Sequence, residues 1–269
     1  MLTVGSLFSG IGGLDLGLER AGMRVIWQSE IDPYACRVLA KHWPDIPNLG
    51  DIREIDWRNV ERTDVVAGGY PCQPFSYNGS RNGADDPRHL WPMFAECIRV
   101  VRPQYALLEN VAGHLSLGFG QVLADLAALG YDAEWDCIPE AAVGAPHLRD
   151  RVFVIATRRH DLHANSQSES GQPKHGSATT WPAPMAYASS VGLPENDSGR
   201  LQLGKQHNGR SRTGGRTWKV EPSVGRVADG IPRRMDRLRA LGNAVVPQVA
   251  EHIGNIIMEA DNDRQIQAP

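Results

Sequence analysis

The sequence predicts an α/β fold in which helices cover both faces of a mostly parallel sheet. Short apolar and β-branched runs alternate with segments of helical periodicity from residue 2 to residue 157. Several of the apolar runs lead into glycine or polar residues, namely Gly10, Glu30, Asp51, Cys72 and Glu109. Residues at the carboxyl ends of neighbouring strands line the ligand crevice of an open parallel sheet. The sequence therefore predicts a ligand-binding domain with its site at that edge.

Length and composition are those of an ordinary globular chain. The 269 residues, 41% hydrophobic and 22% charged, suffice for one large domain or for one domain with a small appendage. No apolar run approaches the roughly 20 residues of a membrane-spanning helix, and the N-terminus lacks a basic-then-apolar signal segment. We therefore expect a cytoplasmic protein without a membrane partner.

The cysteine pattern does not indicate a metal site. Cys36, Cys72, Cys97 and Cys137 are scattered, with no CxxC pair and no Cys/His cluster at zinc spacing. This usage is typical of a reducing cytoplasm. A cysteine with special chemistry would therefore act by itself.

The first strand is expected over residues 2–8, and it runs directly into a glycine-rich turn. Leu14, Leu16 and Leu18 then have helical spacing, and Gly22 closes the helix. A strand, a glycine turn and a helix form the geometry in which a nucleotide-like ligand approaches the backbone at a helix N-terminus. The spacing GxGG differs from the dinucleotide pattern GxGxxG and is a weak signal by itself.

Two acidic residues follow in positions that suit a nucleoside. A second strand over 24–29 ends on Glu30, where a carboxylate can accept hydrogen bonds from two ribose hydroxyls. Glu30 could equally belong to the N-terminal end of the helix expected over 33–42. Asp51 could accept a hydrogen bond from an adenine amino group or simply cap a turn.

The most distinctive segment follows the short buried strand predicted over 64–67. Residues 68–76 read Gly-Gly-Tyr-Pro-Cys-Gln-Pro-Phe-Ser. We expect the glycines to adopt a backbone conformation that would strain other residues, and the prolines to stiffen the turn around Cys72. The residues leave two interpretations of Cys72 open, a reactive thiol at a strand end or a buried structural cysteine. The polar stretch 77–88 is expected to be mobile, and it could close over a substrate.

The alternation continues to residue 157. Helices are expected over 89–101 and 121–129, and strands over 105–108, 132–138 and 152–156. Glu109 follows the first of these strands, and Arg149 and Arg151 precede the last.

Beyond residue 158 the composition changes. Ser, Gly, Asn, Gln, Pro and His dominate through residue 217, which indicates a disordered linker or an inserted module that folds poorly without a partner. Residues 200–239 carry eleven Lys or Arg against three acids, which suits a phosphate-facing surface or a solvated face. A helical pattern runs from 233 to a break at Gly242–Asn243, a last helix is expected over 244–258, and the tail 260–269 is expected to fray.

Seven short motifs occur along the chain, and their order as well as their sequences is informative. They are Ser6–Gly13, Glu30, Gly50–Ile52, Pro71–Gln73, Glu109–Val111, Arg149-x-Arg151 and Gly242–Val245. In sequence and order they resemble the motifs of the DNA (cytosine-5) methyltransferases of bacterial and phage type, over most of residues 3–157 and 226–255. The resemblance implies the Rossmann-like fold of S-adenosylmethionine-dependent methyltransferases. It implies a catalytic domain of residues 1–157 with 226–269, and a short target-recognition region of residues 158–225.

The resemblance also implies roles for individual residues. Cys72 would be the covalent nucleophile that adds to a flipped cytosine, and Glu109 the acid that donates a proton to its N3. Arg149 and Arg151 would supply positive charge near the base carbonyl and the cysteine loop. S-adenosyl-L-methionine would be bound, without a metal, by Phe8, Gly10, Gly12, Glu30, Asp51 and Asn243.

The implied activity is methyl transfer to C5 of cytosine in a specific sequence of double-stranded DNA. We expect a monomer, bacterial or phage-encoded, with a cognate restriction endonuclease as a candidate partner. A transfer-RNA cytosine-5 methyltransferase of the same fold and a catalytically silent DNA-binding homologue are the alternatives, while the glycine spacing disfavours a dehydrogenase. Two departures from the family stand out: His147 replaces the usual Gln, and the recognition region is short.

Overall fold

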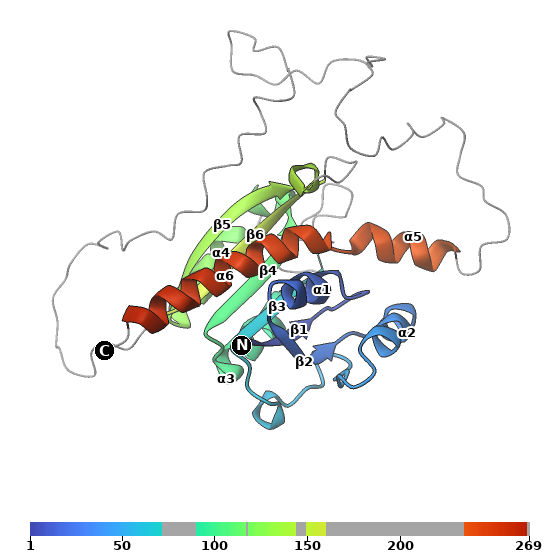
Figure 1. Ribbon diagram of the computed structural model, residues 1–269, viewed down its shortest axis with the longest axis horizontal. Helices are drawn as coiled ribbons and strands as arrows, with labels where there is room; N and C mark the ends of the chain where they lie inside the picture. Colours follow the sequence, from blue (N-terminus) through green and yellow to red (C-terminus); the bar gives the residue numbers. More distant parts are fainter. Residues whose placement is uncertain (72–89, 117, 144–148, 160–233, 268–269) are drawn as a thin grey trace, which may run out of the picture. The chain divides into compact units, whose positions relative to one another are not determined.

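The computed structural model describes residues 1–71, 90–116, 118–143, 149–159 and 234–267 (Figure 1). Within them, six strands form one sheet in the order β2-β1-β3-β4-β6-β5. They are β1 (Thr3–Leu7), β2 (Arg24–Ser29), β3 (Val65–Gly69), β4 (Tyr105–Val111), β5 (Tyr131–Pro139) and β6 (Asp150–Arg158). The first four strands pair in parallel, whereas β6 runs antiparallel to both β4 and β5. The expected mostly parallel sheet is confirmed.

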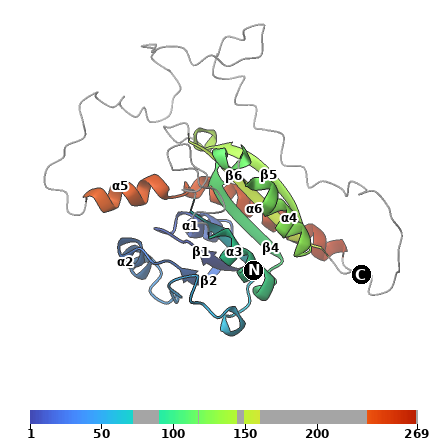
Figure 2. The same ribbon diagram turned by 180° about the vertical axis from the view of Figure 1, so that it is seen from behind.

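Helices cover both faces of this sheet. They are α1 (Gly13–Arg20), α2 (Pro33–His42), α3 (Trp91–Val101), α4 (Phe119–Ala128), α5 (Arg234–Asn243) and α6 (Pro247–Gln267), with short 3-10 turns at η1 (Trp57–Asn59), η3 (Ala112–Ser116) and η4 (Glu140–Val143). On one face α1 and α6 lie side by side (Figure 1), and on the other face lie α3 and α4 (Figure 2). The central strands are nearly continuous apolar runs because both of their faces are covered.

Every helix and strand expected from the sequence is present, but the C-terminal tail differs from expectation. The tail does not fray at residue 260, since α6 continues to Gln267. Ile257 is buried, and the Tyr105 hydroxyl donates a hydrogen bond of 3.4 Å to the buried carboxylate of Asp261. The burial of Ile257 and the hydrogen bond from β4 stabilise a polar segment that has little helical amphipathicity of its own.

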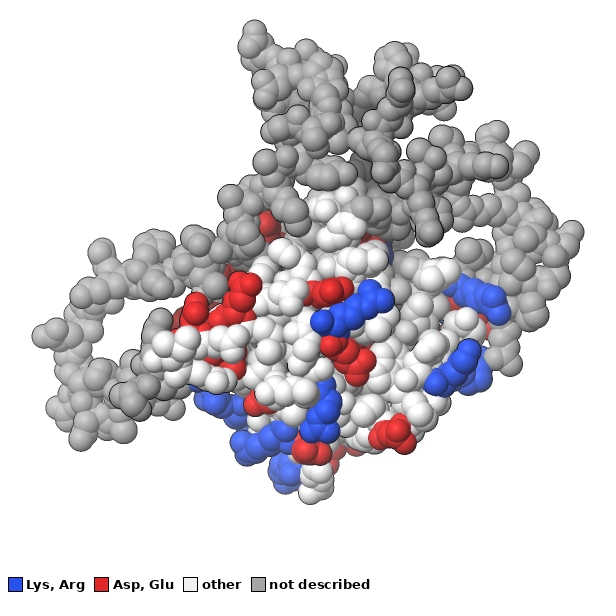
Figure 3. Space-filling view, viewed as in Figure 1, with Lys and Arg blue, Asp and Glu red and all other residues white. Residues whose placement is uncertain are grey.

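Several expectations concern residues outside the described ranges. They are the position of Cys72, the mobility of residues 77–88, the effect of His147, and almost all of the recognition region 158–225. Of the basic stretch 200–239, only α5 is described, with Arg237 and Arg239 among its residues. On the described part of the face in Figure 3, Lys and Arg alternate with Asp and Glu. No helix in the described ranges combines the length and apolarity needed to cross a membrane.

Candidate functional site

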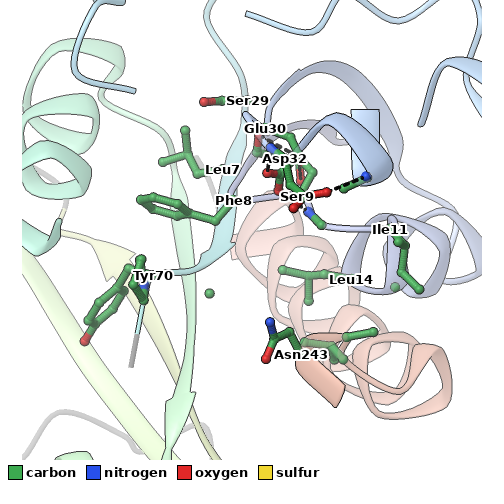
Figure 4. A pocket seen from close by; sticks show the side chains of 18 of the residues that line it. Leu7, Phe8, Ser9, Ile11, Leu14, Ser29, Glu30, Asp32, Tyr70 and Asn243 are labelled. Carbon is green, nitrogen blue, oxygen red and sulfur yellow. Dashed lines mark hydrogen bonds between the residues drawn. The ribbon is translucent and has the colours of Figure 1, made fainter. Parts of the chain in front are cut away.

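A cavity of about 370 Å³ lies at the carboxyl ends of β1, β2, β3 and β4. Figure 4 shows part of its wall, with Phe8 and Tyr70 on one side, Glu30 and Asp32 beside the glycine turn, and Asn243 on α5. The sequence-predicted site residues that line it are Phe8, Gly10, Glu30, Asp51, Glu109, Arg149, Arg151 and Asn243. Tyr70 and Pro71, the last described residues before Cys72, line it as well. Residues separated by up to 235 positions therefore share one cavity.

The turn between β1 and α1 is held in an unusual backbone conformation. Phe8 has a φ of 53°, a left-handed value that bulky residues rarely adopt. Such a conformation costs about 1–3 kcal/mol and persists only where the surroundings impose it. The turn brings the backbone N–H of Gly10 within 2.7 Å of Oε2 of Glu30, which it donates to. The strained turn thus joins the end of β1 to the acid at the end of β2.

Gly12, unlike the other residues predicted to bind the cofactor, is not among the residues that line the cavity. Its φ is 80°, and a Cβ at this position would lie 2.4 Å from the ring of Trp43, just after α2. Gly12 is therefore required for the turn and for close packing between α1 and the end of α2.

Glu30 accepts backbone hydrogen bonds at the start of α2, as one of the two interpretations of its position expected, and it also lines the cavity. Oε2 accepts the Gly10 N–H, and Oε1 accepts the backbone N–H groups of Ile31 and Asp32 at 2.8 and 2.7 Å. Asp32, in turn, caps α2 by accepting from Tyr34 and Ala35. An ionised carboxylate has about four acceptor positions. Three are occupied here, so Glu30 retains acceptor capacity toward the cavity that it lines.

Asp51 lies in the cavity wall beside Arg53. The Arg53 guanidinium contacts both carboxylate oxygens, with its Nη2 2.5 Å from Oδ2 and its Nε 2.9 Å from Oδ1. The hydrogen bonds from Arg53 lower the pKa of Asp51, so this carboxylate remains ionised and able to accept. Arg53 is a cavity residue that the sequence did not single out.

The opposite part of the wall carries the buried acid Glu109, at the end of β4. Its Oε1 lies 2.9 Å from Nε of Arg151, on the neighbouring strand β6. Burial raises the pKa of Glu109, while the charges of Arg151 and Arg149 act against this increase. The protonated form of Glu109 is therefore easier to reach than that of an exposed glutamate.

Gly69 makes room for this acid. A Cβ on Gly69 would lie 2.4 Å from Oε2 of Glu109, and one on Gly68 would lie 2.5 Å from the carbonyl oxygen of Leu7. Neither glycine has a positive φ, and both belong to β3. The expectation of a special backbone conformation here was wrong, because the two glycines serve close approach between neighbouring strands.

Arg149 faces the end of α5. Its Nη1 donates to Oε1 of the buried Glu140 at 2.6 Å and to the carbonyl of Ala244 at 2.5 Å, and its Nη2 donates to the carbonyl of Gly242 at 2.9 Å. These bonds bracket Asn243. The guanidinium therefore holds the segment that carries Asn243, and Arg149 also lines the cavity.

Two buried polar clusters escaped the sequence analysis. Beneath the glycine turn, Asp15 accepts from the Ser6 hydroxyl at 2.5 Å and from the Gln28 amide at 2.6 Å. Beside the cavity, the Tyr70 hydroxyl lies 2.6 Å from Nε2 of His114, and the Asn110 amide donates to the Tyr70 carbonyl. The sequence offered one signal, since Asp15 lies on the face of α1 that also buries Leu14 and Leu18.

The sheet order and the cavity at its carboxyl edge define an α/β domain of the methyltransferase class. A family profile described as C-5 cytosine-specific DNA methylase matches residues 2–214 of the chain. The chain belongs to this family of DNA methylases, which confirms the resemblance.

Individual relatives agree with this assignment. The Type II methyltransferase M.Eco47II of Escherichia coli is 36% identical over 164 residues, covering 58% of this chain and 39% of its own length. M.NgoMIV of Neisseria gonorrhoeae is 37% identical over 155 residues, or 56% of this chain and 50% of its own. The chain also resembles a crystal structure described as a DNA modification methyltransferase encoded within a prophage of E. coli. The two superpose with a TM-score of 0.51 at 30% sequence identity, over 59% of this chain and 47% of the other. The chain thus spans half or less of the length of these relatives.

Proposed function

We propose that this chain transfers a methyl group from S-adenosyl-L-methionine to C5 of a flipped cytosine in a specific sequence of double-stranded DNA. The observation that carries this proposal is the set of residues that line the cavity at the carboxyl ends of β1 to β4. One part of its wall presents the acceptors Glu30 and Asp51, which suit a nucleoside, and another presents the buried Glu109–Arg151 pair. Pro71, directly before Cys72, lines the same cavity.

The cavity residues fit the proposed methyl donor. Glu30 would accept hydrogen bonds from the ribose hydroxyls, and Asp51 would accept one from the adenine amino group. Phe8, Gly10 and Asn243 would bound the remaining surface of the ligand. When bound, S-adenosylmethionine supplies an electrophilic methyl group. A metal has no part in this scheme.

The chemistry requires a nucleophile, because C5 of cytosine cannot attack a methyl sulfonium unaided. The Cys72 thiolate would form a bond to C6, moving an electron pair toward C5 while Glu109 donates a proton to N3. The electron pair at C5 would then form the bond to the methyl group, and S-adenosylhomocysteine would leave. Loss of the C5 proton would restore the C5–C6 double bond and expel the Cys72 thiolate, while N3 returns its proton to Glu109. Arg151 would hold Glu109 in place through its 2.9 Å pair. The cytosine must leave the duplex to reach these groups.

The described cysteines support the assignment of Cys72. Burial raises the pKa of the thiols of Cys36, Cys97 and Cys137, and none of the three lines the cavity. A nucleophilic cysteine requires thiolate character and access to substrate. Cys72 follows directly on the cavity residues Tyr70 and Pro71, within the segment that matches the family motif.

The remaining parts of the proposal follow from the activity. Residues 158–225 would form the region that reads the target sequence, with their Lys and Arg residues contacting phosphates. The enzyme would act as a monomer in the cytoplasm of a bacterium or a phage-infected cell. A cognate restriction endonuclease with the same target sequence would be its functional partner.

The proposal is tested with the purified chain, methyl-labelled S-adenosylmethionine and either duplex DNA or transfer RNA. We expect incorporation into duplex DNA only, at C5 of cytosine in one sequence. Cys72→Ser should abolish incorporation while Cys137→Ser, which alters a partly exposed thiol on β5 outside the cavity lining, should retain it. A duplex with 5-fluorocytosine in the mapped target should trap wild-type protein, because fluorine cannot leave as the C5 proton does. Turnover by Cys72→Ser, or labelling of transfer RNA alone, would refute the proposal.

A further inference from the structure

We propose that Arg239 is a positioning residue for the methyl donor: its pair with Asp32 holds helix α5 over the cavity and so sets how fast the bound ligand leaves. This inference rests on the proposed cofactor site. It concerns α5, a segment of the cavity wall whose described side chains are not buried.

The residues of α5 that line the cavity lie on one face of the helix. They are Asp236, Arg239, Ala240 and Asn243, with the spacing i, i+3, i+4 and i+7. In a surface helix of a globular protein this face is normally apolar and packs on the core. In α5 it is mostly polar and faces a cavity. A ligand in the cavity would therefore contact this face of α5.

The described side chains of α5 pack little on the core. Among the α5 residues whose side chains are described, none is buried, and Met235 and Leu241 are 73% and 64% exposed. The next helix, α6, differs sharply, because Val249, Ala250, Ile253 and Ile257 are all buried. Helices gain most of their stability from packing an amphipathic face. A helix without such packing opens at low cost in free energy.

The two ends of α5 are attached with unequal strength. At the C-terminal end, Arg149 donates to the carbonyls of Gly242 and Ala244 and is backed by the buried Glu140. Close packing adds to this attachment, since a Cβ on Gly13 would lie 2.3 Å from the carbonyl oxygen of Val245. This end is fixed to the domain.

Toward the N-terminal end, the attachment among described residues is the pair between Arg239 and Asp32. The Nη2 of Arg239 lies 2.8 Å from Oδ2 of Asp32, and the two side chains are 62% and 34% exposed. Exposed ion pairs contribute little and are screened by salt. When the pair breaks, Arg239 still has Asp236, one helical turn away at 3.6 Å. The helix can therefore swing on its C-terminal end while the Arg239–Asp32 pair acts as a latch.

The position of the latch connects it to ligand retention. Asp32 caps α2 two residues beyond Glu30, so the latch closes α5 over the part of the cavity where Glu30 would hold the ribose. A ligand in the cavity would contact both α5 and the strand ends, and it must leave past one of them. Weakening the latch should therefore speed dissociation without altering the groups that carry out the chemistry.

The test measures dissociation of S-adenosylmethionine from the full chain by stopped flow, with excess unlabelled ligand as the chase. Arg239→Gln removes the cation. Asp32→Asn removes the anion and keeps an amide that caps α2, so the fold is preserved. Each should speed dissociation about two- to five-fold, the range expected for an exposed pair. Because both variants break one pair, the double variant should match the single ones.

Arg99→Gln is the matched control. Arg99 is 59% exposed and pairs with Glu96 on α3, away from the cavity. It should leave the dissociation rate unchanged. In 0.5 M salt the wild-type rate should approach that of Arg239→Gln, because screening removes the pair. Ligand should also slow hydrogen exchange of α5 amides in the wild type, and less so in Arg239→Gln.

Failure of the latch proposal can be distinguished from failure of the proposed cofactor site. If the ligand binds the wild type and leaves at the same rate from Arg239→Gln and Asp32→Asn, the latch is refuted while the cofactor site stands. If the wild type does not bind S-adenosylmethionine at all, the proposed cofactor itself is wrong, and the latch with it.

Discussion

Asp15 gives the sharpest quantitative prediction for this protein. Its carboxylate is completely buried under the glycine turn, between the Ser6 hydroxyl and the Gln28 amide. Burial raises the pKa of Asp15 from 3.8 to about 6, although both hydrogen bonds oppose the increase. The substitution Asp15→Asn keeps the shape of the side chain and removes its charge. The Gln28 amide can turn over to accept from the new amide group.

The expected size of the effect follows from this shift. A change of about two pKa units corresponds to about 3 kcal/mol of differential stability between the protonated and ionised forms. Because the folded-state pKa lies above the unfolded one, the folded protein binds the extra proton between pH 4 and pH 6. The stability contributed by protonated Asp15 is therefore complete below about pH 4, is lost as pH rises through about 6, and is absent above.

The measurement is urea unfolding of both proteins at pH 4, 5, 6 and 7.5, followed by fluorescence of buried tryptophans such as Trp27. The free energy of unfolding of Asp15→Asn, minus that of the wild type, should increase by about 3 kcal/mol from pH 4 to pH 7.5. Titrations common to both proteins cancel in this difference. A difference that stays constant across the range would show that Asp15 is not a buried acid with a raised pKa.

Three further predictions concern the cavity wall. Gly69→Ala should displace the Glu109 carboxylate and lower the rate of methyl transfer at least about tenfold, with little change in cofactor affinity. The control Gly120→Ala, where a Cβ meets nothing within 4 Å, should leave the rate unchanged. Equal rates for the two variants would contradict the packing argument. Glu109→Gln should lower transfer by about 10²-fold. It should also abolish the loss of rate that the wild type shows as pH rises above the raised pKa of Glu109. Arg149→Met should cost about 3 kcal/mol in urea unfolding because Glu140 is buried, and Glu140→Gln in the same chain should restore part of it.

The sequence by itself determined the fold class, the order of the elements and the edge of the sheet that carries the site. These properties depend on local patterns: apolar runs of strand length, helical spacing, and the residues at which each run ends. The motif around Cys72 and its neighbours in order identified the family, because chemistry restricts residue types at a few positions whatever surrounds them.

Only the tertiary structure decided how individual residues are used. A side chain at Gly69 would collide with Glu109 of the neighbouring strand, and one at Gly12 would collide with Trp43. Arg149 binds the end of a helix that lies 93 residues further along the chain. The burial of Asp15 and the exposure of α5 are likewise invisible in their own segments. Each depends on which distant residues share a cavity or a packing contact, and that information arises only when the chain has folded.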